Sequence, residues 1–421
     1  MAMTITEKIL ARASGRAEVK PGDIINGKID YAMVGDGVCS LFNEGFREIG
    51  VPVWDKDRAV IVVDHACPAC TVGYAKWVTD TIKFAEDFNI THFYNMQGIE
   101  HQIMPEQGFV APGALIVGAD SHTTTYGALG AFSTGLGATE MTWVMATGEL
   151  WFKVPETIRV EVSGRLKPRV MGKDVVLKLL SLIGVNGATY KALEFGGEAA
   201  HQMSIDDRLT ICNMAVELGA KNGIFETDDK TFEYLEGRAL DPVEEWRSDP
   251  GCAYSATIHI NADELVPQVS CPHNPGNVAD IDKVIGTKVD QILLGSCTGG
   301  RMEDYRAAAE IFRANLKGQK IPRHLRCLVI PASAQVAKDM LKEGLTELFL
   351  DSGCVVSNPQ CGPCGGMQMG FISPGEVCIG THNRNFRGRM GSPDGEIYLA
   401  SPATCAAAAI TGSITDPRRL G

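Results

Sequence analysis

The fold class is decided by the segment Lys288–Arg301, with the sequence KVDQILLGSCTGGR. Its apolar first half predicts a buried strand over Lys288–Leu294, and its glycine-rich second half predicts a loop over Gly295–Arg301. A helical pattern follows over Glu303–Leu316, where apolar residues recur on one face. Strand, loop and helix in this order form the repeating unit of α/β folds.

The same alternation continues on both sides of this segment. Downstream it predicts three strands, at Leu325–Ile330, Leu348–Val356 and Val377–Gly380. It also predicts a helix over Gln335–Leu345. Upstream it predicts strands at Arg58–Val63 and Ala114–Val117. A second region then begins with the helical segment Val175–Leu182 and continues with a helix over Asp206–Leu218, which has Ser204 as its cap. Polar loops follow several of these strands, and in open α/β sheets the carboxyl edge is where ligands bind. The Gly-, Pro- and Asn-rich stretch Cys271–Ala279 is interpreted as a linker.

Composition narrows the classes of protein. A chain of 421 residues exceeds the ~250–300 residues of a single core, so two to four domains are expected. The net charge is −12 and no basic block occurs, which argues against a nucleic-acid partner. No apolar run approaches the ~20 residues that span a bilayer, and the N-terminus lacks the apolar core of a signal peptide, so a cytoplasmic protein with no membrane contact is expected.

Thirteen cysteines in such a chain indicate metal or redox chemistry, because a reducing cytosol keeps thiols free. Four cysteines in apolar surroundings are predicted to be small core residues: Cys212, Cys327, Cys378 and Cys405.

Three other cysteines lie at predicted strand ends: Cys297, and the pair in Cys361-Gly362-Pro363-Cys364. Iron–sulfur clusters are held by thiolates, and three ligands would leave one iron open as a Lewis acid. Two alternatives stay open: a thioredoxin-like motif, although Gly365-Gly366 is a poor helix start, and a structural zinc site shared with Cys67 and Cys70.

A second group of candidate residues consists of carboxylates and histidines: Asp64-His65, His101, Asp120-Ser121-His122 and Glu217. This group suits proton transfer, because a carboxylate that is hydrogen-bonded to an imidazole fixes its tautomer. A third group consists of arginines. The arginines lie in Asn383–Arg389 (NRNFRGR), where they could grip carboxylates or form a solvated loop.

Together these segments resemble the aconitase superfamily over nearly the whole chain. The motifs that carry the resemblance are Gly118–Thr123 (GADSHT), Gly295–Thr298 (GSCT), Cys361–Cys364 (CGPC) and Asn383–Arg389. Within the superfamily, the chain resembles the large subunits of 3-isopropylmalate dehydratases, in the shorter form that homoaconitases share.

The resemblance implies a [4Fe-4S] hydro-lyase acting on a branched malate-type hydroxy acid. One cluster per chain, with one open iron, would be held by Cys297, Cys361 and Cys364. Three pairs would stabilise and protonate the leaving hydroxyl: Asp64–His65, Asp120–His101 and Glu217–His122. Ser121, Arg384 and Arg389 would bind substrate, and Asn213 and Asn383 would support the cluster.

The resemblance also implies three α/β domains of the aconitase type around a central cluster cleft, at 1–155, 156–275 and 276–421. The fourth, swivelling domain of single-chain relatives would be absent, and a small partner subunit would supply it together with the catalytic base.

Several positions depart from the usual pattern of the superfamily. A common histidine is Gly35, a common cysteine is Glu100, and asparagine is often found in place of Gly299; the stretch Gly365–Gln368 and Ala334 also differ. These changes make 2,3-dimethylmalate an alternative to 3-isopropylmalate as the substrate. A hypothesis of another class is a binding or regulatory protein without catalysis, and the acidic composition speaks against RNA as its ligand.

Overall fold

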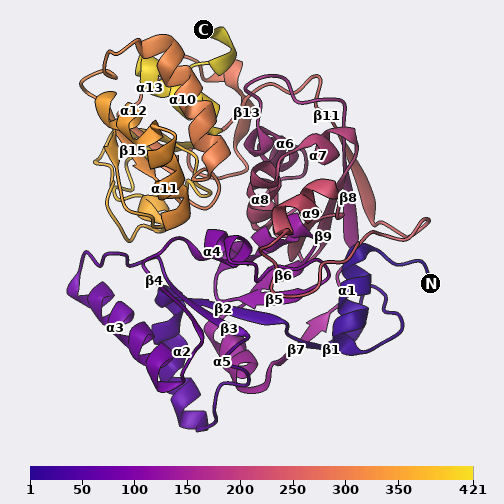
Figure 1. Ribbon diagram of the computed structural model, residues 1–421. Coiled ribbons are helices and arrows are strands. Elements are labelled where there is room, and N and C mark those ends of the chain that lie inside the picture. Colours follow the sequence, from indigo (N-terminus) through magenta and orange to yellow (C-terminus); the bar gives the residue numbers. More distant parts are fainter. Residues whose placement is uncertain (421) are drawn as a thin grey trace. The chain divides into compact units, whose positions relative to one another are not determined.

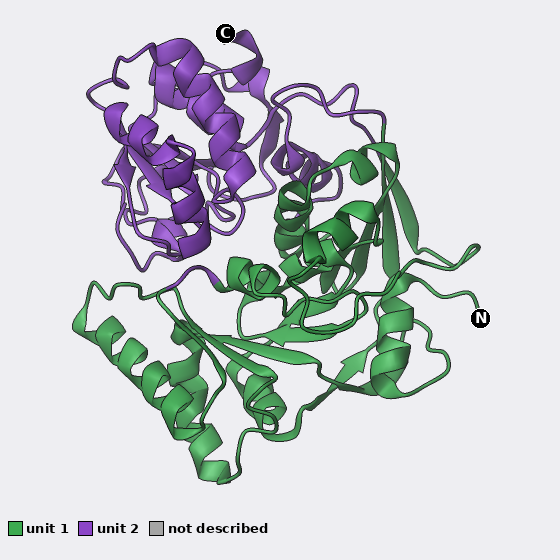
Figure 2. Ribbon diagram, in the orientation of Figure 1, with its two compact units in different colours: residues 1–96, 100–163, 186–259 green, residues 97–99, 164–185, 260–421 purple. Residues whose placement is uncertain are grey.

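The computed structural model describes residues 1–420, which form two compact units (Figure 2). Unit 1 comprises residues 1–96, 100–163 and 186–259. Unit 2 comprises residues 97–99, 164–185 and the described residues from 260 onward.

The first sheet of unit 1 has five parallel strands in the order β4-β3-β2-β5-β6 (Figure 1). Their bounds are β2 Tyr31–Gly35, β3 Ala59–Val63, β4 His92–Asn95, β5 Leu115–Gly118 and β6 Phe132–Gly135. The sequence AVIVV of β3 is buried throughout, as expected of a central parallel strand covered on both faces. The neighbouring helices are α1 Ile5–Ser14, α2 Asp36–Ile49, α3 Val72–Asp87, α4 Glu100–Glu106, η1 Ser121–Leu129 and α5 Ala138–Thr147, and a separate antiparallel ribbon joins β1 Ile24–Lys28 to β7 Glu149–Lys153.

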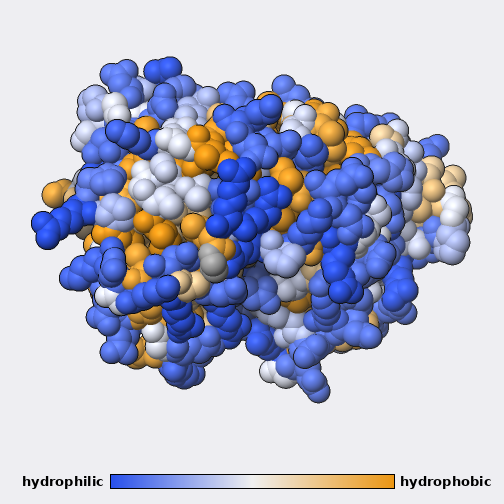
Figure 3. Space-filling model, turned by 90° about the horizontal axis from the view of Figure 1, so that it is seen from above, coloured by the Kyte–Doolittle hydropathy of each residue, from blue (hydrophilic) through white to orange (hydrophobic). Residues whose placement is uncertain are grey.

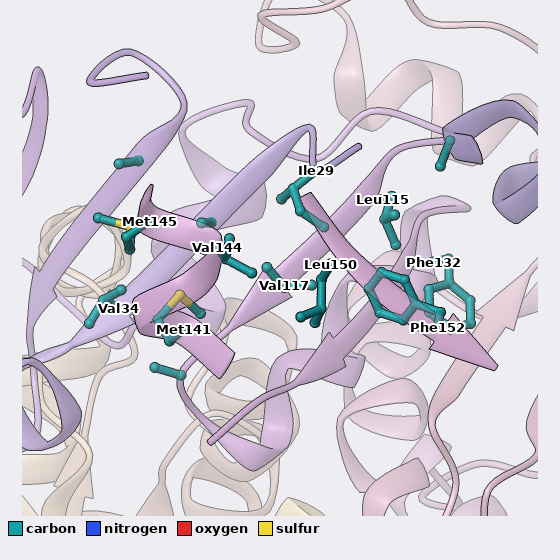
Figure 4. Close-up of a cluster of buried hydrophobic side chains, with 14 of the residues drawn as sticks. Ile29, Val34, Leu115, Val117, Phe132, Met141, Val144, Met145, Leu150 and Phe152 are labelled. Carbon is teal, nitrogen blue, oxygen red and sulfur yellow. The ribbon is translucent and has the colours of Figure 1, made fainter. Parts of the chain in front are cut away.

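The core of this region lies between the sheet and its helices (Figure 4). Val34 of β2 and Val117 of β5 belong to the same buried cluster as Met141 and Val144 of α5. Because all five strands are parallel, their carboxyl ends lie along one edge of the sheet.

A second sheet of unit 1 has the order β10-β9-β8-β11. It contains β8 Thr157–Ser163, β9 Ala192–Gly196, β10 Asn222–Phe225 and β11 Ala256–Asn261, with helices α7 Glu198–Gln202, α8 Ile205–Asn213, η2 Met214–Leu218 and α9 Asp229–Leu235. Ser204 caps α8 by accepting the backbone N–H of Asp207 at 3.1 Å, which confirms the predicted cap. The predicted helix over Asp206–Leu218 changes to 3₁₀ geometry after Asn213.

Unit 2 is built on seven strands in the order β13-β12-β18-β17-β14-β15-β16. Their bounds are β12 Gln268–Ser270, β13 Val278–Asp280, β14 Gln291–Gly295, β15 Arg326–Ile330, β16 Val355–Val356, β17 Val377–Gly380 and β18 Glu396–Leu399. The helices are α6 Gly172–Ile183, η3 Ile281–Lys283, α10 Met302–Leu316, α11 Ala334–Lys342, α12 Leu345–Asp351, η4 Gly362–Gly365, α13 Pro402–Thr411 and η5 Pro417–Arg419. The strands from β18 to β16 are parallel, as the alternating pattern of this half predicts.

Two predicted elements of unit 2 were wrong. The strand expected over Leu348–Val356 is reduced to Val355–Val356, because Leu345 and Phe349 share a buried face of the helix α12. The stretch expected to be a linker, Cys271–Ala279, is the turn of a hairpin: Val278 and Ala279 belong to β13, which pairs antiparallel with β12.

The four cysteines predicted to be core residues are buried: Cys212, Cys327, Cys378 and Cys405. Figure 3 shows one face of the surface, on which hydrophilic residues surround smaller groups of hydrophobic ones. Among residues 1–420, no helix combines the length and the apolar character needed to cross a membrane.

Candidate functional site

The carboxyl edge of the five-stranded sheet carries the histidines and carboxylates of unit 1. β2 runs into Asp36, β3 into Asp64-His65, and β5 into Asp120-Ser121-His122. Since the strands are adjacent and parallel, three polar segments far apart in sequence meet at one place.

Asp64 and His65 form the first pair. The Nδ1 of His65 lies 2.7 Å from Oδ1 of Asp64, and Asp64 is fully buried. Asp36 holds this corner by accepting the backbone N–H groups of His65 at 3.0 Å and Ala66 at 2.8 Å. Burial opposes protonation of His65, but the charge of Asp64 and its hydrogen bond, with a smaller effect of Asp36, raise the pKa of His65 well above the ordinary value. The carboxylates around His65 therefore favour its charged imidazolium form.

His101 and Asp120 form the second pair, with 2.8 Å between Nε2 of His101 and Oδ1 of Asp120. The other ring nitrogen of His101 lies 3.3 Å from the hydroxyl of Tyr126. Burial lowers the pKa of His101. Although burial works against it, hydrogen bonds from His101 and His122 hold the pKa of Asp120 well below its usual range. The pair is thus a neutral imidazole beside a carboxylate.

His122 and Glu217 form the third pair, at 3.0 Å between Nε2 and Oε1. The backbone N–H of His122 donates to Asp120 at 2.7 Å, which links the second pair to the third. Ser121 is partly exposed, and its hydroxyl lies 3.5 Å from Nδ1 of His122. All three pairs implied by the resemblance are therefore within hydrogen-bonding distance in unit 1.

The cysteines lie in unit 2, again at strand ends. Cys297 follows β14, the pair Cys361 and Cys364 follows β16, and all three side chains are buried. Only the short 3₁₀ turn η4 follows Cys361, and it ends at Gly365. The α-helix that a thioredoxin-like motif needs directly after its cysteines is not formed there, which disfavours that alternative.

Asn383, in the loop after β17, connects the sulfur atoms. Its side-chain amide donates to Sγ of Cys297 at 3.4 Å, and its backbone N–H donates to Cys364. The Cys361 thiol is hydrogen-bonded to Cys364. This bond is the main reason why the pKa of the Cys364 thiol lies well below its ordinary value, although burial acts in the opposite direction.

The donor set fits an iron–sulfur cluster. A thiolate, not a thiol, binds iron, and the surroundings of Cys364 favour the thiolate form. The sulfurs of Cys297 and Cys364 share one asparagine as hydrogen-bond donor, and hydrogen bonds to sulfur tune the properties of such clusters.

The loop after β17 also holds the predicted arginines. Arg389 donates from Nε to the backbone carbonyl of Cys364 at 2.7 Å, so it stabilises the cysteine loop besides any contact with substrate. Arg384 is partly exposed. Asn213, predicted to support the cluster, ends α8 in unit 1, where its side chain donates to the hydroxyl of Thr125 at 2.8 Å.

Sequence reasoning missed the residues that hold these loops. Thr381 bridges β17 and the Cys297 loop: its hydroxyl accepts the N–H of Gly295 at 2.9 Å and lies 2.7 Å from the carbonyl of Gly295. A Cβ at Gly299 would lie 2.3 Å from Cβ of Thr381, so this departure from the superfamily has a steric reason. The buried Lys173 donates from Nζ to the carbonyls of Thr381 at 3.0 Å and His382 at 2.7 Å. No motif marks Lys173, because it lies about 200 residues from its partners.

Comparison with known proteins gives the family. The model of the aconitase family (aconitate hydratase) matches residues 7–288 and 282–412. The chain belongs to the aconitase family, as its motifs predicted.

Individual relatives match over their full length. A probable 3-isopropylmalate dehydratase large subunit from Methanothermobacter thermautotrophicus is 48% identical, over 100% of both chains. A 3-isopropylmalate dehydratase large subunit from Moorella thermoacetica is also 48% identical, over 100% of both chains. A probable methanogen homoaconitase large subunit from M. thermautotrophicus is 47% identical, over 99% of this chain and 98% of its own.

Among solved structures, aconitase X of Thermococcus kodakaraensis in its holo form is similar, with a TM-score of 0.50 and 12% identity. The match covers 99% of this chain and 96% of that one. At this identity the similarity concerns the fold alone, and it confirms the prediction of an aconitase-type α/β fold.

Proposed function

We propose that this chain is the cluster-bearing large subunit of a hydro-lyase that dehydrates and rehydrates a branched malate-type hydroxy acid, with 3-isopropylmalate as its substrate. The observation that carries the proposal is the presence of two residue sets at the sheet edges. Unit 1 holds three histidine–carboxylate pairs. Unit 2 holds three buried cysteines, of which Asn383 contacts Cys297 and Cys364, and Cys361 is hydrogen-bonded to Cys364. The names of the full-length relatives support the substrate and the large-subunit role.

Cys297, Cys361 and Cys364 would hold one [4Fe-4S] cluster, which supplies a Lewis acid at its open iron when bound. Asn383 keeps two of the sulfurs oriented through its side chain and its backbone N–H. Asn213 would support the cluster surroundings.

His65 is the proposed acid for the departing hydroxyl. Its Nδ1 faces Asp64 at 2.7 Å, so the proton that moves is the one on Nε2. Asp120 Oδ2 lies 3.8 Å from that atom and stabilises the imidazolium. The pairs of His101 with Asp120 and of His122 with Glu217 fix the orientation of Asp120.

Substrate carboxylates need cationic or hydroxyl donors. Ser121, Arg384 and Arg389 are the proposed ligands, since guanidinium groups bind carboxylates in bidentate fashion. A small partner subunit would supply the fourth domain and the base that removes the proton; the names of the relatives as large subunits support such a partner.

The proposed division is into three domains, 1–155, 156–275 and 276–421. It is supported by the three multi-stranded sheets, which fall mainly one to each range, although β12 pairs with strands of the third. The proposed location is the cytoplasm, because a chain with thirteen cysteines and a cluster with an open iron would need a reducing environment.

A homoaconitase is the second candidate, because one relative with that name is nearly as similar as the dehydratases. An assay of the anaerobically reconstituted chain with its small subunit, measuring formation of the unsaturated acid, tests both. Turnover of 3-isopropylmalate at least tenfold above homocitrate and 2,3-dimethylmalate is expected. A preference for either of the others reassigns the substrate.

The cluster itself is tested by iron content and electron paramagnetic resonance. Cys364→Ala should lose the signal. Cys378→Ala is the matched control, since Cys378 lies in β17, where burial raises its pKa to about 12 and keeps the thiol protonated. Full iron content in Cys364→Ala would contradict the ligand assignment.

A further inference from the structure

Glu100 is the one carboxyl of the unit 1 cluster that the pairs described above leave out. It is the first residue of α4 and is fully buried. Within residues 1–420, neither of its carboxylate oxygens accepts a hydrogen bond. By contrast, Asp36, Asp64 and Asp120 each accept at least one backbone N–H, which is the usual way to keep a buried carboxylate charged.

The charges that face Glu100 come from every element packed against it. They are Asp36 after β2, Asp64 and His65 after β3, His101 of α4, and Asp120 after β5. The Oε1 of Glu100 lies 3.7 Å from Nε2 of His101, and Glu100, His65 and Asp120 have donor or acceptor atoms within 4.8 Å of one another. A further negative charge at this position, beside three carboxylates and without a hydrogen bond, would be strongly disfavoured, as is any unpaired buried ion.

Gly35 makes room for this carboxyl. A Cβ built on Gly35 would lie 2.5 Å from Oε2 of Glu100, so the carboxyl end of the Glu100 side chain would have to move out of its present place. The backbone of Gly35 has φ −82°, which any residue adopts, so the need for glycine is one of space and not of conformation. Gly35 and Glu100 are therefore a matched pair, and these are two of the positions at which the sequence departs from its superfamily.

We propose that Glu100 is an uncharged acid of this cluster, a positioning residue that holds a proton between Asp64 and Asp120 and thereby sets the charge of His65, with Gly35 as the position that admits it. Burial, together with Asp64 and Asp120, raises the pKa of Glu100 well above its ordinary value, in agreement with this geometry. The catalytic meaning rests on the proposed function; the protonation of Glu100 and its coupling to Gly35 do not.

The consequence for catalysis appears on the alkaline side. When Glu100 loses its proton, the new charge strengthens the hold of His65 on its own proton and repels an anionic substrate. The rate of the wild-type protein should therefore fall as Glu100 ionises, and Glu100→Gln, which cannot ionise, should move that alkaline limb of kcat/KM to higher pH.

The direct test needs no activity. Infrared difference spectra of the full chain, recorded across a pH titration, should show the band of a protonated carboxylic acid that disappears at alkaline pH. Glu100→Gln should lack the band, and Glu106→Gln, on the same helix, should keep it. A band unchanged in Glu100→Gln would overturn the proposal. So would a stoichiometric divalent cation that co-purifies with the wild type and is lost in Glu100→Gln, because the cation would then replace the proton.

The coupling to Gly35 is tested by a double-mutant cycle. Gly35→Ala should shift the pH titration of the His65 ring, followed by nuclear magnetic resonance, in the presence of Glu100. In a Glu100→Ala background the same change should have less than about half of that effect, since the clash is gone. Equal effects in both backgrounds would show that the two residues are independent. These titrations can succeed where every substrate assay fails, so failure of the proposed function and failure of this inference are distinguishable.

Discussion

Asn383 donates its side-chain amide to the sulfur of Cys297 at 3.4 Å and its backbone N–H to Cys364. One residue thus contacts two loops that are 67 positions apart in the sequence, by a count from 297 to 364. Its side-chain oxygen is also hydrogen-bonded to the hydroxyl of Thr298.

Asn383→Ala should therefore loosen the sulfurs without removing a ligand. Removal of groups that orient ligands typically lowers metal affinity by about 10- to 100-fold, and iron loss after exposure to a chelator should accelerate on that scale. Iron retained per chain against time is the measurement. Asn385→Ala is the control, because Asn385 donates to Ser270 and to the carbonyl of Cys271 instead. Equal rates in both variants would show that loop stability, and not the contact with sulfur, is responsible.

Lys173→Met should destabilise unit 2. Methionine fills a similar volume, but the two carbonyls of Thr381 and His382 lose a charged donor. Hydrogen bonds to charged groups contribute ~1.5–3 kcal/mol each, so the loss of two should lower the free energy of unfolding by about 3–6 kcal/mol. The reconstituted iron content should fall as well. Denaturant unfolding of both proteins measures this change in the free energy of unfolding. Lys178→Met, on the same helix, should cost less than about 1 kcal/mol.

The buried ion pair of Arg208 and Asp228 should be the most sensitive charge pair of unit 1. Arg208 is fully inaccessible, and its guanidinium donates to both oxygens of Asp228 at 2.9 and 2.5 Å. Arg208→Met should cost about 3–5 kcal/mol, because it leaves Asp228 without its cation. The exposed pair Arg306–Glu343 is the control, and its loss should cost less than ~1 kcal/mol.

Acid should weaken the same pair. Burial opposes the charge of Asp228, but Arg208 lowers its pKa below the ordinary 3.8. A carboxyl with a depressed pKa contributes stability that is present above 3.8 and is lost as the pH falls through the lower value of the folded state. The difference in unfolding free energy between wild type and Arg208→Met should shrink in that acidic range, and a difference independent of pH would speak against the ion pair.

The contribution of Glu100 to stability should depend on pH in the opposite direction from that of Asp228. Its pKa is raised above the ordinary 4.5, so its contribution is complete below 4.5 and is lost as the pH rises towards the raised value. Relative to Glu100→Gln, the wild type should lose up to about 1.4 kcal/mol of stability per pH unit in that interval. Thermal unfolding of the two chains over a pH series checks this. Parallel curves would mean that Glu100 is charged throughout.

The sequence allowed the α/β class, most strands and the polar strand ends to be predicted, because buried β-branched runs such as AVIVV are followed directly by charged residues. The histidine–carboxylate pairs followed from motifs that the chain shares with its superfamily. What escaped prediction is packing over long distances. Lys173 looks like an ordinary helix residue, and only the fold brings its amino group to the carbonyl oxygen of His382.

The error at Leu348–Val356 has a similar origin. A short apolar run suits a strand and a buried helix equally well, and the contacts of Phe349 decided for the helix. Gly35 and Glu100 were noticed only as separate departures, since sequence alone cannot show that an atom on one would overlap the other.

The hydroxyl of Thr381 replaces a backbone group in the ladder between β17 and β14, by bonding to both the N–H and the carbonyl of Gly295. The Cys297 loop is thereby an extension of the sheet, and its shape is determined by the folding of the polypeptide. Binding of a metal to such a preformed loop would not require the chain to become ordered. The proposed cluster could therefore be lost and rebuilt while the chain stays folded.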